Sequence, residues 1–187
     1  MQKYEFSLPM PTKKEHIDDF VKINKKLTKS EITSLFFALP INSPDITRFE
    51  QIRTILEKVT YFDYWKEIIE KAKENNFDVI YLLNSSRPLL IQSSFLSTQL
   101  EKLDILIKNL LASGCNKVRI SNLQLLAYIA KKYPEVEIYV STTLEYNYLR
   151  QYENLIKFFP QIKQIVLSHE VNKNFKLIKK IGRASCR

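Results

Sequence analysis

Small polar side chains and one histidine–glutamate pair follow the apolar runs of this sequence, and they are the residues best suited to chemistry. A histidine can transfer protons near neutral pH, and a carboxylate can act as acid or base. Serine, threonine and asparagine supply the hydrogen bonds that hold a polar substrate. We predict that His169 and Glu170 are catalytic. We predict that the other polar residues after these runs bind substrate: Asn84, Ser121, Asn122, Ser141, Thr142, Thr143 and Ser168.

The same residue types have a purely structural use. Serine, threonine or asparagine just before a helix accepts hydrogen bonds from its first free N–H groups, and Glu170 could cap a helix in the same way. Adjacent residues at a strand exit also point in different directions, which weakens the case for His169 and Glu170 acting together. Each residue alone leaves both interpretations open, and the repetition of the pattern favours a polar pocket.

These residues need a scaffold, and the apolar periodicity indicates about six strands, each followed by a helix. Strands are predicted at residues 4–8, 35–39, 77–83, 118–120, 136–140 and 165–167. Helical spacing of apolar residues lies between them, and Thr12 with Glu15 has the spacing of a capping box before the first helix. Alternating strands and helices predict a parallel sheet whose strand ends meet at one rim.

Two architectures share this alternation, an open doubly wound sheet and a (β/α) barrel. An open sheet that binds a dinucleotide would carry a glycine-rich turn after an early strand. Here the first strand runs into Pro9 and Pro11, and Gly114 is the first glycine of the chain. A complete barrel needs eight units and about 250 residues. We therefore predict an α/β fold, an incomplete (β/α) TIM-like barrel of about six parallel βα units, over residues 1–180.

The last seven residues differ in composition from the rest. Ile181 to Arg187 bring glycine, alanine, serine, cysteine and two arginines after a stretch rich in Lys, Asn, Phe and Ile. We expect the native coding sequence to end near Lys180 and residues 181–187 to be a non-native read-through tail. Cys115 is then the remaining cysteine, and it cannot ligate an iron–sulfur cluster, which takes about four thiolates. No metal site is predicted.

Charge and hydropathy restrict the partners. The formal net charge of +9 is compatible with RNA, but the lysines are scattered over the predicted helices, so a lysine-rich composition is the favoured explanation. No apolar run approaches the roughly 20 residues that span a bilayer, and the N-terminus lacks the apolar core of a signal peptide. We expect a cytoplasmic protein that acts on RNA or a small molecule and does not bind membranes.

One charged side chain, Arg119, lies within a predicted strand. Facing the interior of a barrel, it would bind an anion or a carboxylate. Facing outward, it would lay its apolar stem between the helices and keep its charge in water. We slightly favour the outward orientation.

Four motifs follow one another in the second half of the chain. They are the strand Tyr81-Leu82-Leu83-Asn84, the segment from Gly114 to Leu126, the strand Glu137–Thr142 with its Ser-Thr exit, and Val166–Glu170 with its Leu-Ser-X-Glu ending. In this order they resemble the collagenase-like peptidase family, the class labelled U thirty-two, over about residues 77–180. Two positions depart from that pattern, because Asn122 stands where an aspartate is usual and His169 where an arginine is usual.

The resemblance implies a barrel protein whose later part supplies cysteines for an iron–sulfur cluster. Members are named peptidases, yet several resemble oxygen-independent hydroxylation enzymes that act on RNA or on a quinone precursor. The chain would then be an N-terminal fragment, inactive by itself and without a cofactor of its own. Two alternatives stay open: a peptidase of the same label, for which the sequence offers no nucleophile–base pair, and a non-enzymatic basic RNA-binding module.

Overall fold

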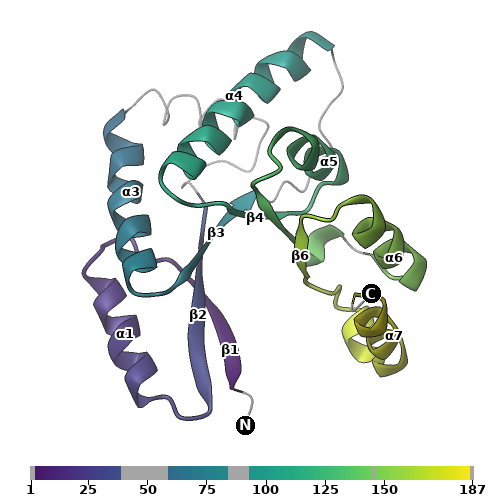
Figure 1. The fold of residues 1–187 in the computed structure, drawn as a ribbon, viewed down its shortest axis with the longest axis horizontal. Coiled ribbons are helices and arrows are strands. Elements are labelled where there is room, and N and C mark those ends of the chain that lie inside the picture. Colours follow the sequence, from purple (N-terminus) through teal and green to yellow (C-terminus); the bar gives the residue numbers. More distant parts are fainter. Residues whose placement is uncertain (1–2, 39–58, 84–92, 145, 186–187) are drawn as a thin grey trace. The chain divides into compact units, whose positions relative to one another are not determined.

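The structure is a computed structural model that describes residues 3–38, 59–83, 93–144 and 146–185. Strands and helices alternate along the chain, and the strands follow one another in the order β1-β2-β3-β4-β5-β6 (Figure 1). The chain forms two compact units, residues 1–81 with 91–116, and residues 82–90 with 117–187. The first unit carries β1, β2 and most of β3, and the second carries β4, β5 and β6.

Three parallel strands form the sheet of the first unit, and the described residues between them include two helices. The strands are β1 (Tyr4–Pro9), β2 (Ser30–Phe37) and β3 (Asp78–Leu83); the helices are α1 (His16–Lys26) and α3 (Val59–Glu74), and α4 (Ser93–Ala112) follows. The Phe37 ring stacks on the Trp65 ring of α3, with centroids 5.0 Å apart. The face of β2 that carries Leu35 and Phe37 is therefore the face that packs on the helix.

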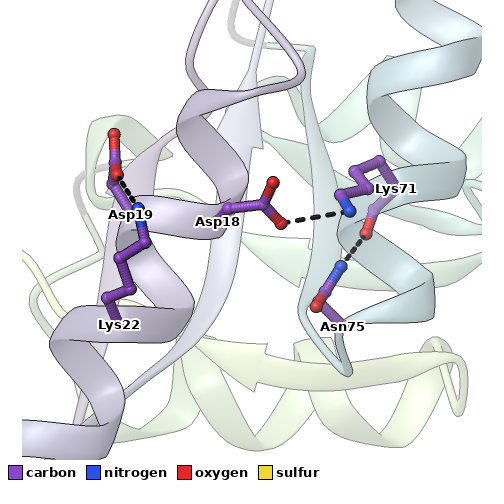
Figure 2. A network of polar contacts seen from close by, with 5 residues as sticks. All are labelled: Asp18, Asp19, Lys22, Lys71 and Asn75. Atoms are coloured by element: carbon purple, nitrogen blue, oxygen red, sulfur yellow. Dashed lines mark hydrogen bonds and ion pairs between the residues drawn. The ribbon is translucent and has the colours of Figure 1, made fainter.

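Polar contacts join the α1 region to α3. Asp18 Oδ1 lies 3.0 Å from Lys71 Nζ (Figure 2), and Lys14 Nζ lies 2.7 Å from Glu67 Oε2. Beside them, the Asn75 amide donates to the Lys71 carbonyl oxygen at 2.8 Å. Because the ion-pairing side chains are largely exposed, solvent screens the pairs, and they orient the two helices more than they stabilise them.

Helices α3 and α4 end in the same way, with a left-handed residue just beyond the helix. Asn76 (φ 62°) and Gly114 (φ 80°) hold these positions. After α4, Gly114 N–H donates to the Leu111 carbonyl and Cys115 N–H to the Leu110 carbonyl, a Schellman motif that satisfies the last carbonyls of the helix. Glycine and asparagine suit these sites because they adopt positive φ at little cost.

The second unit repeats the pattern with shorter strands. Its strands are β4 (Lys117–Ile120), β5 (Glu137–Val140) and β6 (Ile162–Ile165); its helices are α5 (Leu123–Lys132), α6 (Leu149–Phe158) and α7 (Phe175–Ser185), with 3-10 turns η1 (Thr142–Leu144) and η2 (Val171–Lys173). Helix α5 connects β4 to β5, and α6 connects β5 to β6 (Figure 1). Because crossovers between parallel neighbours are almost always right-handed, both helices are expected on one face of the sheet.

Packing identifies that face. Ile165 is in register with Val140, and it packs against the cluster of Tyr152, Val171 and Ile181 from α6, η2 and α7. The strand residues on this face are almost inaccessible to solvent: Val118, Ile120, Ile138 and Val140. Burial of this apolar face against the helices is the main stabilising contribution in the second unit.

Three predicted boundaries are wrong. The first helix begins at His16, so Thr12 and Glu15 form no capping box, and Glu15 makes no side-chain cap. Residues 12–15 instead form turns, in which His16 N–H donates to the Lys13 carbonyl. The second strand starts at Ser30, earlier than the predicted residue 35, because its polar first half pairs with β1. The last strand ends at Ile165, because Leu167 joins the helical cluster and not the sheet.

The predicted fold class is confirmed. Six strands alternate with helices, and the pairs β1–β2, β2–β3, β4–β5 and β5–β6 are parallel. This is the succession of the first six units of a (β/α) barrel. Helix α7 continues through Lys180 to Ser185, and Ile181 is buried; the read-through origin of residues 181–187 stays a prediction.

Candidate functional site

The carboxyl ends of β4, β5 and β6 meet at one edge of the second unit. Ile120 pairs with Val140, and Val140 pairs with Ile165. The ladder continues one step further, because Ser141 N–H donates to the Ile120 carbonyl and Val166 N–H to the Val140 carbonyl, both at 2.9 Å. The parallel register thus brings polar residues that are far apart in the sequence to the same level.

Of the predicted substrate-binding residues, two lie at this edge directly after a strand, and two more follow in η1. Ser121 and Ser141 are buried, and Thr142 is half-buried and opens η1, which also contains Thr143. Asn84 lies outside the described residues. The edge is therefore polar but mostly enclosed, and substrate binding by these residues stays a prediction.

Asn122 caps a helix. Its side-chain oxygen accepts a hydrogen bond from Leu125 N–H at 3.0 Å, at the start of α5. An aspartate at this place would cap the helix equally well, so the departure from the family pattern leaves this structural role intact.

Ser168 is a junction between segments. Its hydroxyl lies 2.9 Å from Asn147 Oδ1 and 3.2 Å from the Tyr146 carbonyl oxygen, and it accepts from Val171 N–H at 3.4 Å. The Tyr152 hydroxyl also donates to the Tyr146 carbonyl. The serine predicted to bind substrate therefore ties the end of β6 to the segment after η1 and to η2.

His169 and Glu170 are both exposed. Glu170 occupies the N-cap position of η2 but makes no side-chain cap. Within the described part of the chain, neither side chain takes part in a hydrogen bond or an ion pair that would orient it toward the buried serines. Their catalytic role stays a prediction and needs a substrate, or a further part of the protein, to position them.

A hollow opens beside this edge. Its lining comes from the ends of β5 and β6, from η1 and from α6: Val140, Ser141, Thr142, Leu144, Tyr146, Tyr152, Ile165, Val166 and Ser168. It encloses about 170 Å³ including its open mouth, but the interior leaves no room for a water-sized sphere. The rings of Tyr146 and Tyr152 meet edge to face, 5.9 Å apart. Burial raises the pKa of both phenols, and hydrogen bonding to Ser168 partly offsets this for the pKa of Tyr152. Because its interior has no room for even a water molecule, the hollow is packed protein core and not a ligand cavity.

The opposite face of the same strands is polar. Arg119 pairs in register with Tyr139, and Tyr139 with Gln164. Because strand residues alternate between faces, these three point away from the face on which Val140 and Ile165 pack against the helices. The outward orientation favoured for Arg119 from sequence is therefore wrong: in a barrel this face would line the interior. The sequence alone does not single out Tyr139 and Gln164; the strand register places them in one row with Arg119.

No group of three or more His, Cys, Asp or Glu side chains that could hold a metal ion occurs among the described residues. The Cys115 thiol is buried just before β4, 3.5 Å from the Val79 carbonyl oxygen. Within the same described ranges, no helix is long and apolar enough to cross a bilayer.

No family model and no curated protein matches the chain. Among solved structures it is similar to a point mutant of an O-GlcNAc hydrolase from Thermobaculum terrenum, with a TM-score of 0.58 and 15% identity. The match covers all of this chain and 45% of that one, so the chain spans less than half the length of that enzyme. At this identity the likeness concerns the fold alone. Fold and comparison together define the class of the chain: an α/β protein of parallel βα units, as in barrel enzymes.

Proposed function

We propose that the chain supplies the first βα units of a barrel enzyme of the collagenase-like peptidase family, labelled U thirty-two, which acts in hydroxylation of RNA or of a quinone precursor. The observation that carries the proposal is the shared carboxyl edge of β4, β5 and β6, where polar residues directly follow β4 and β5. In barrel enzymes this carboxyl edge holds the active site. The ordered motifs from Tyr81 to Glu170 support the choice of family.

In this proposal the polar edge binds substrate, and His169 and Glu170 transfer protons as general acid and base. Both side chains are exposed in the segment after β6, where substrate can reach them. The iron–sulfur cluster would be held by cysteines of a part of the protein beyond Lys180, since the described residues contain no cluster of thiols.

A peptidase of the same family label is less well supported. Nucleophilic catalysis needs a hydroxyl or thiol within hydrogen-bond reach of a base. The Ser168 hydroxyl is engaged by Asn147, Tyr146 and Val171, and the thiol of Cys115 is buried at the other end of β4.

Glycoside hydrolysis is not favoured by the likeness to the O-GlcNAc hydrolase. That chemistry usually employs two carboxyl groups that flank the scissile bond. Two carboxylates follow these strands before the next helix: Glu145 lies outside the described residues, and Glu170 is exposed, so the described residues bring no carboxyl pair together there.

The test begins with the gene and the whole protein. We expect the uninterrupted gene to encode, after codon 180, further βα units and about four clustered cysteines, and the purified protein to contain iron and sulfide. We also expect a deletion strain to lack one hydroxylated nucleoside or quinone, and a His169→Ala gene not to restore it. As a matched control, Lys131→Ala alters an exposed residue at the end of α5 and should restore it fully. A gene that encodes no cysteine cluster would remove the iron–sulfur chemistry from this proposal. Proteolysis by the purified whole protein would favour the peptidase instead.

A further inference from the structure

A half-buried arginine on the polar face of β4–β6 has no counter-charge among the described residues. Arg119 lies in the middle of β4, and its Nε atom is inaccessible to solvent and has no hydrogen-bond partner within that part of the chain. Burial lowers the pKa of its guanidinium, which reflects the cost of holding the positive charge there. A buried charge of this kind is normally compensated by an opposite charge.

Its neighbours on β5 and β6 do not provide one. The residues in register with it on the polar face are Tyr139 and Gln164, which are neutral. Glu137 lies on the same face, but it is in register with Lys117, one level nearer the amino ends of the strands. Burial is the largest cause of the lowered pKa of Arg119, and Tyr139, not a carboxylate, is what opposes it.

We propose that Arg119 binds an oxyanion of the substrate, a carboxylate or a phosphate group, on the polar face of β4, β5 and β6. The planar guanidinium offers a fork of N–H donors that fits either group. The phenol of Tyr139 and the amide of Gln164 carry further donors in the same row. Neighbouring strands lie about 4.8 Å apart, so the three side chains span a width suited to a small anion.

This inference deepens the proposed function, and it rests on it in one respect: the polar face must line the substrate space of the barrel. The ligand class would then be an anionic substrate held by its charged group, with the polar edge of the strands directly above. Ser121 and Ser141 directly follow β4 and β5, at the carboxyl end of the strands that carry Arg119 and Tyr139.

The experiment titrates the 187-residue chain with inorganic phosphate and, separately, with acetate. Binding is followed by the Nε–H resonance of Arg119 in heteronuclear NMR spectra, assigned with Arg119→Lys. We expect a saturable shift of that resonance. Arg119→Met, which keeps the apolar stem, should weaken binding about 10- to 100-fold, as expected for a charged hydrogen-bonding partner. Arg119→Lys should weaken it less. The matched control, Lys131→Met, should bind as the unaltered chain does.

The two ligands separate the two sources of the anion. Tighter phosphate binding assigns a phosphate-bearing substrate, and acetate binding of at least equal strength assigns a carboxylate. An Arg119 resonance that does not move with either anion would overturn the inference, and so would unchanged binding by a folded Arg119→Met chain. Should Arg119→Met not fold, the resonance of the unaltered chain decides. Anion binding without a cysteine cluster in the gene would sink the proposed function alone, whereas a cluster without anion binding would sink this inference alone.

Discussion

Replacing Ser168 by alanine tests whether this residue is a structural junction. Its hydroxyl connects three segments: it is within hydrogen-bond distance of Asn147 Oδ1 and the Tyr146 carbonyl, and it accepts from Val171 N–H. The residue is 6% exposed, so water cannot replace these partners. The alanine variant therefore leaves the Val171 N–H without its acceptor and removes a donor from the segment after η1.

The expected cost follows from these contacts. A buried polar group left without a partner costs about 1–3 kcal/mol. The 3.4 Å bond from Val171 is long, which places this contribution in the lower half of that range. Adding the lost donor, we expect the free energy of unfolding to fall by about 2 kcal/mol. With a urea m-value near 3 kcal/mol/M, the upper end for small proteins, the midpoint should fall by about 0.7 M.

Urea unfolding followed by circular dichroism measures this shift. Ser7→Ala serves as the control, because Ser7 is an exposed serine on β1 and its replacement should cost less than about 0.5 kcal/mol. In a double-mutant cycle with Tyr152→Phe, the two changes should not add, since both hydroxyls meet the Tyr146 carbonyl. A Ser168→Ala midpoint equal to that of Ser7→Ala would refute the structural role and return Ser168 to substrate binding.

Three further changes probe the two units. Asn24→Ala removes both hydrogen bonds that the Asn24 amide makes with the Ile32 backbone, at 2.9 and 2.8 Å; we expect a loss of about 2 kcal/mol in urea unfolding, and Asn24→Asp should recover less than half of it. Gly114→Ala puts a side chain at φ 80° and should lower stability by about 1–2 kcal/mol, with Gly114→Asn in between; a neutral alanine variant would show that the backbone relaxes. Burial raises the folded-state pKa of Tyr146 and Tyr152 above 10.0. Their contribution to stability is therefore complete below the unfolded-state pKa and is lost as pH rises through the folded-state pKa. Tyr152→Phe should flatten this decline of the free energy of unfolding at alkaline pH, and an unchanged pH profile would contradict the prediction.

Local signals were sufficient for much of the fold. Helix α5 is bounded by local signals, because Asn122 caps its start and Pro134 follows its end. Gly114 ends α4 because glycine adopts the positive φ found there. The last strand was misplaced because Leu167 is as apolar as a strand residue, and only its packing against the cluster of Tyr152, Val171 and Ile181 shows that the chain has left the sheet there. Apolar periodicity therefore finds elements, but it does not separate a buried strand from a buried loop.

The site was harder to predict because it depends on which face of the sheet each side chain occupies. The alternation in Lys117–Ile120 shows that Val118 and Arg119 point to opposite sides of the sheet, but it does not say which side the helices cover. That choice is made by distant residues: Ile165 lies in register with Val140 and packs on Tyr152, which assigns one face to α6 and leaves the other to Arg119. Their distance from the strand ends distinguishes the serines from one another. Ser168 lies three residues beyond β6 and is engaged by its own chain, whereas Ser121 and Ser141 directly follow β4 and β5, the strands that carry Arg119 and Tyr139. An anionic substrate held by Arg119 would thus meet these two serines before it reached Ser168, so any loss of substrate binding should be larger for Ser141→Ala than for Ser168→Ala when both variants are folded.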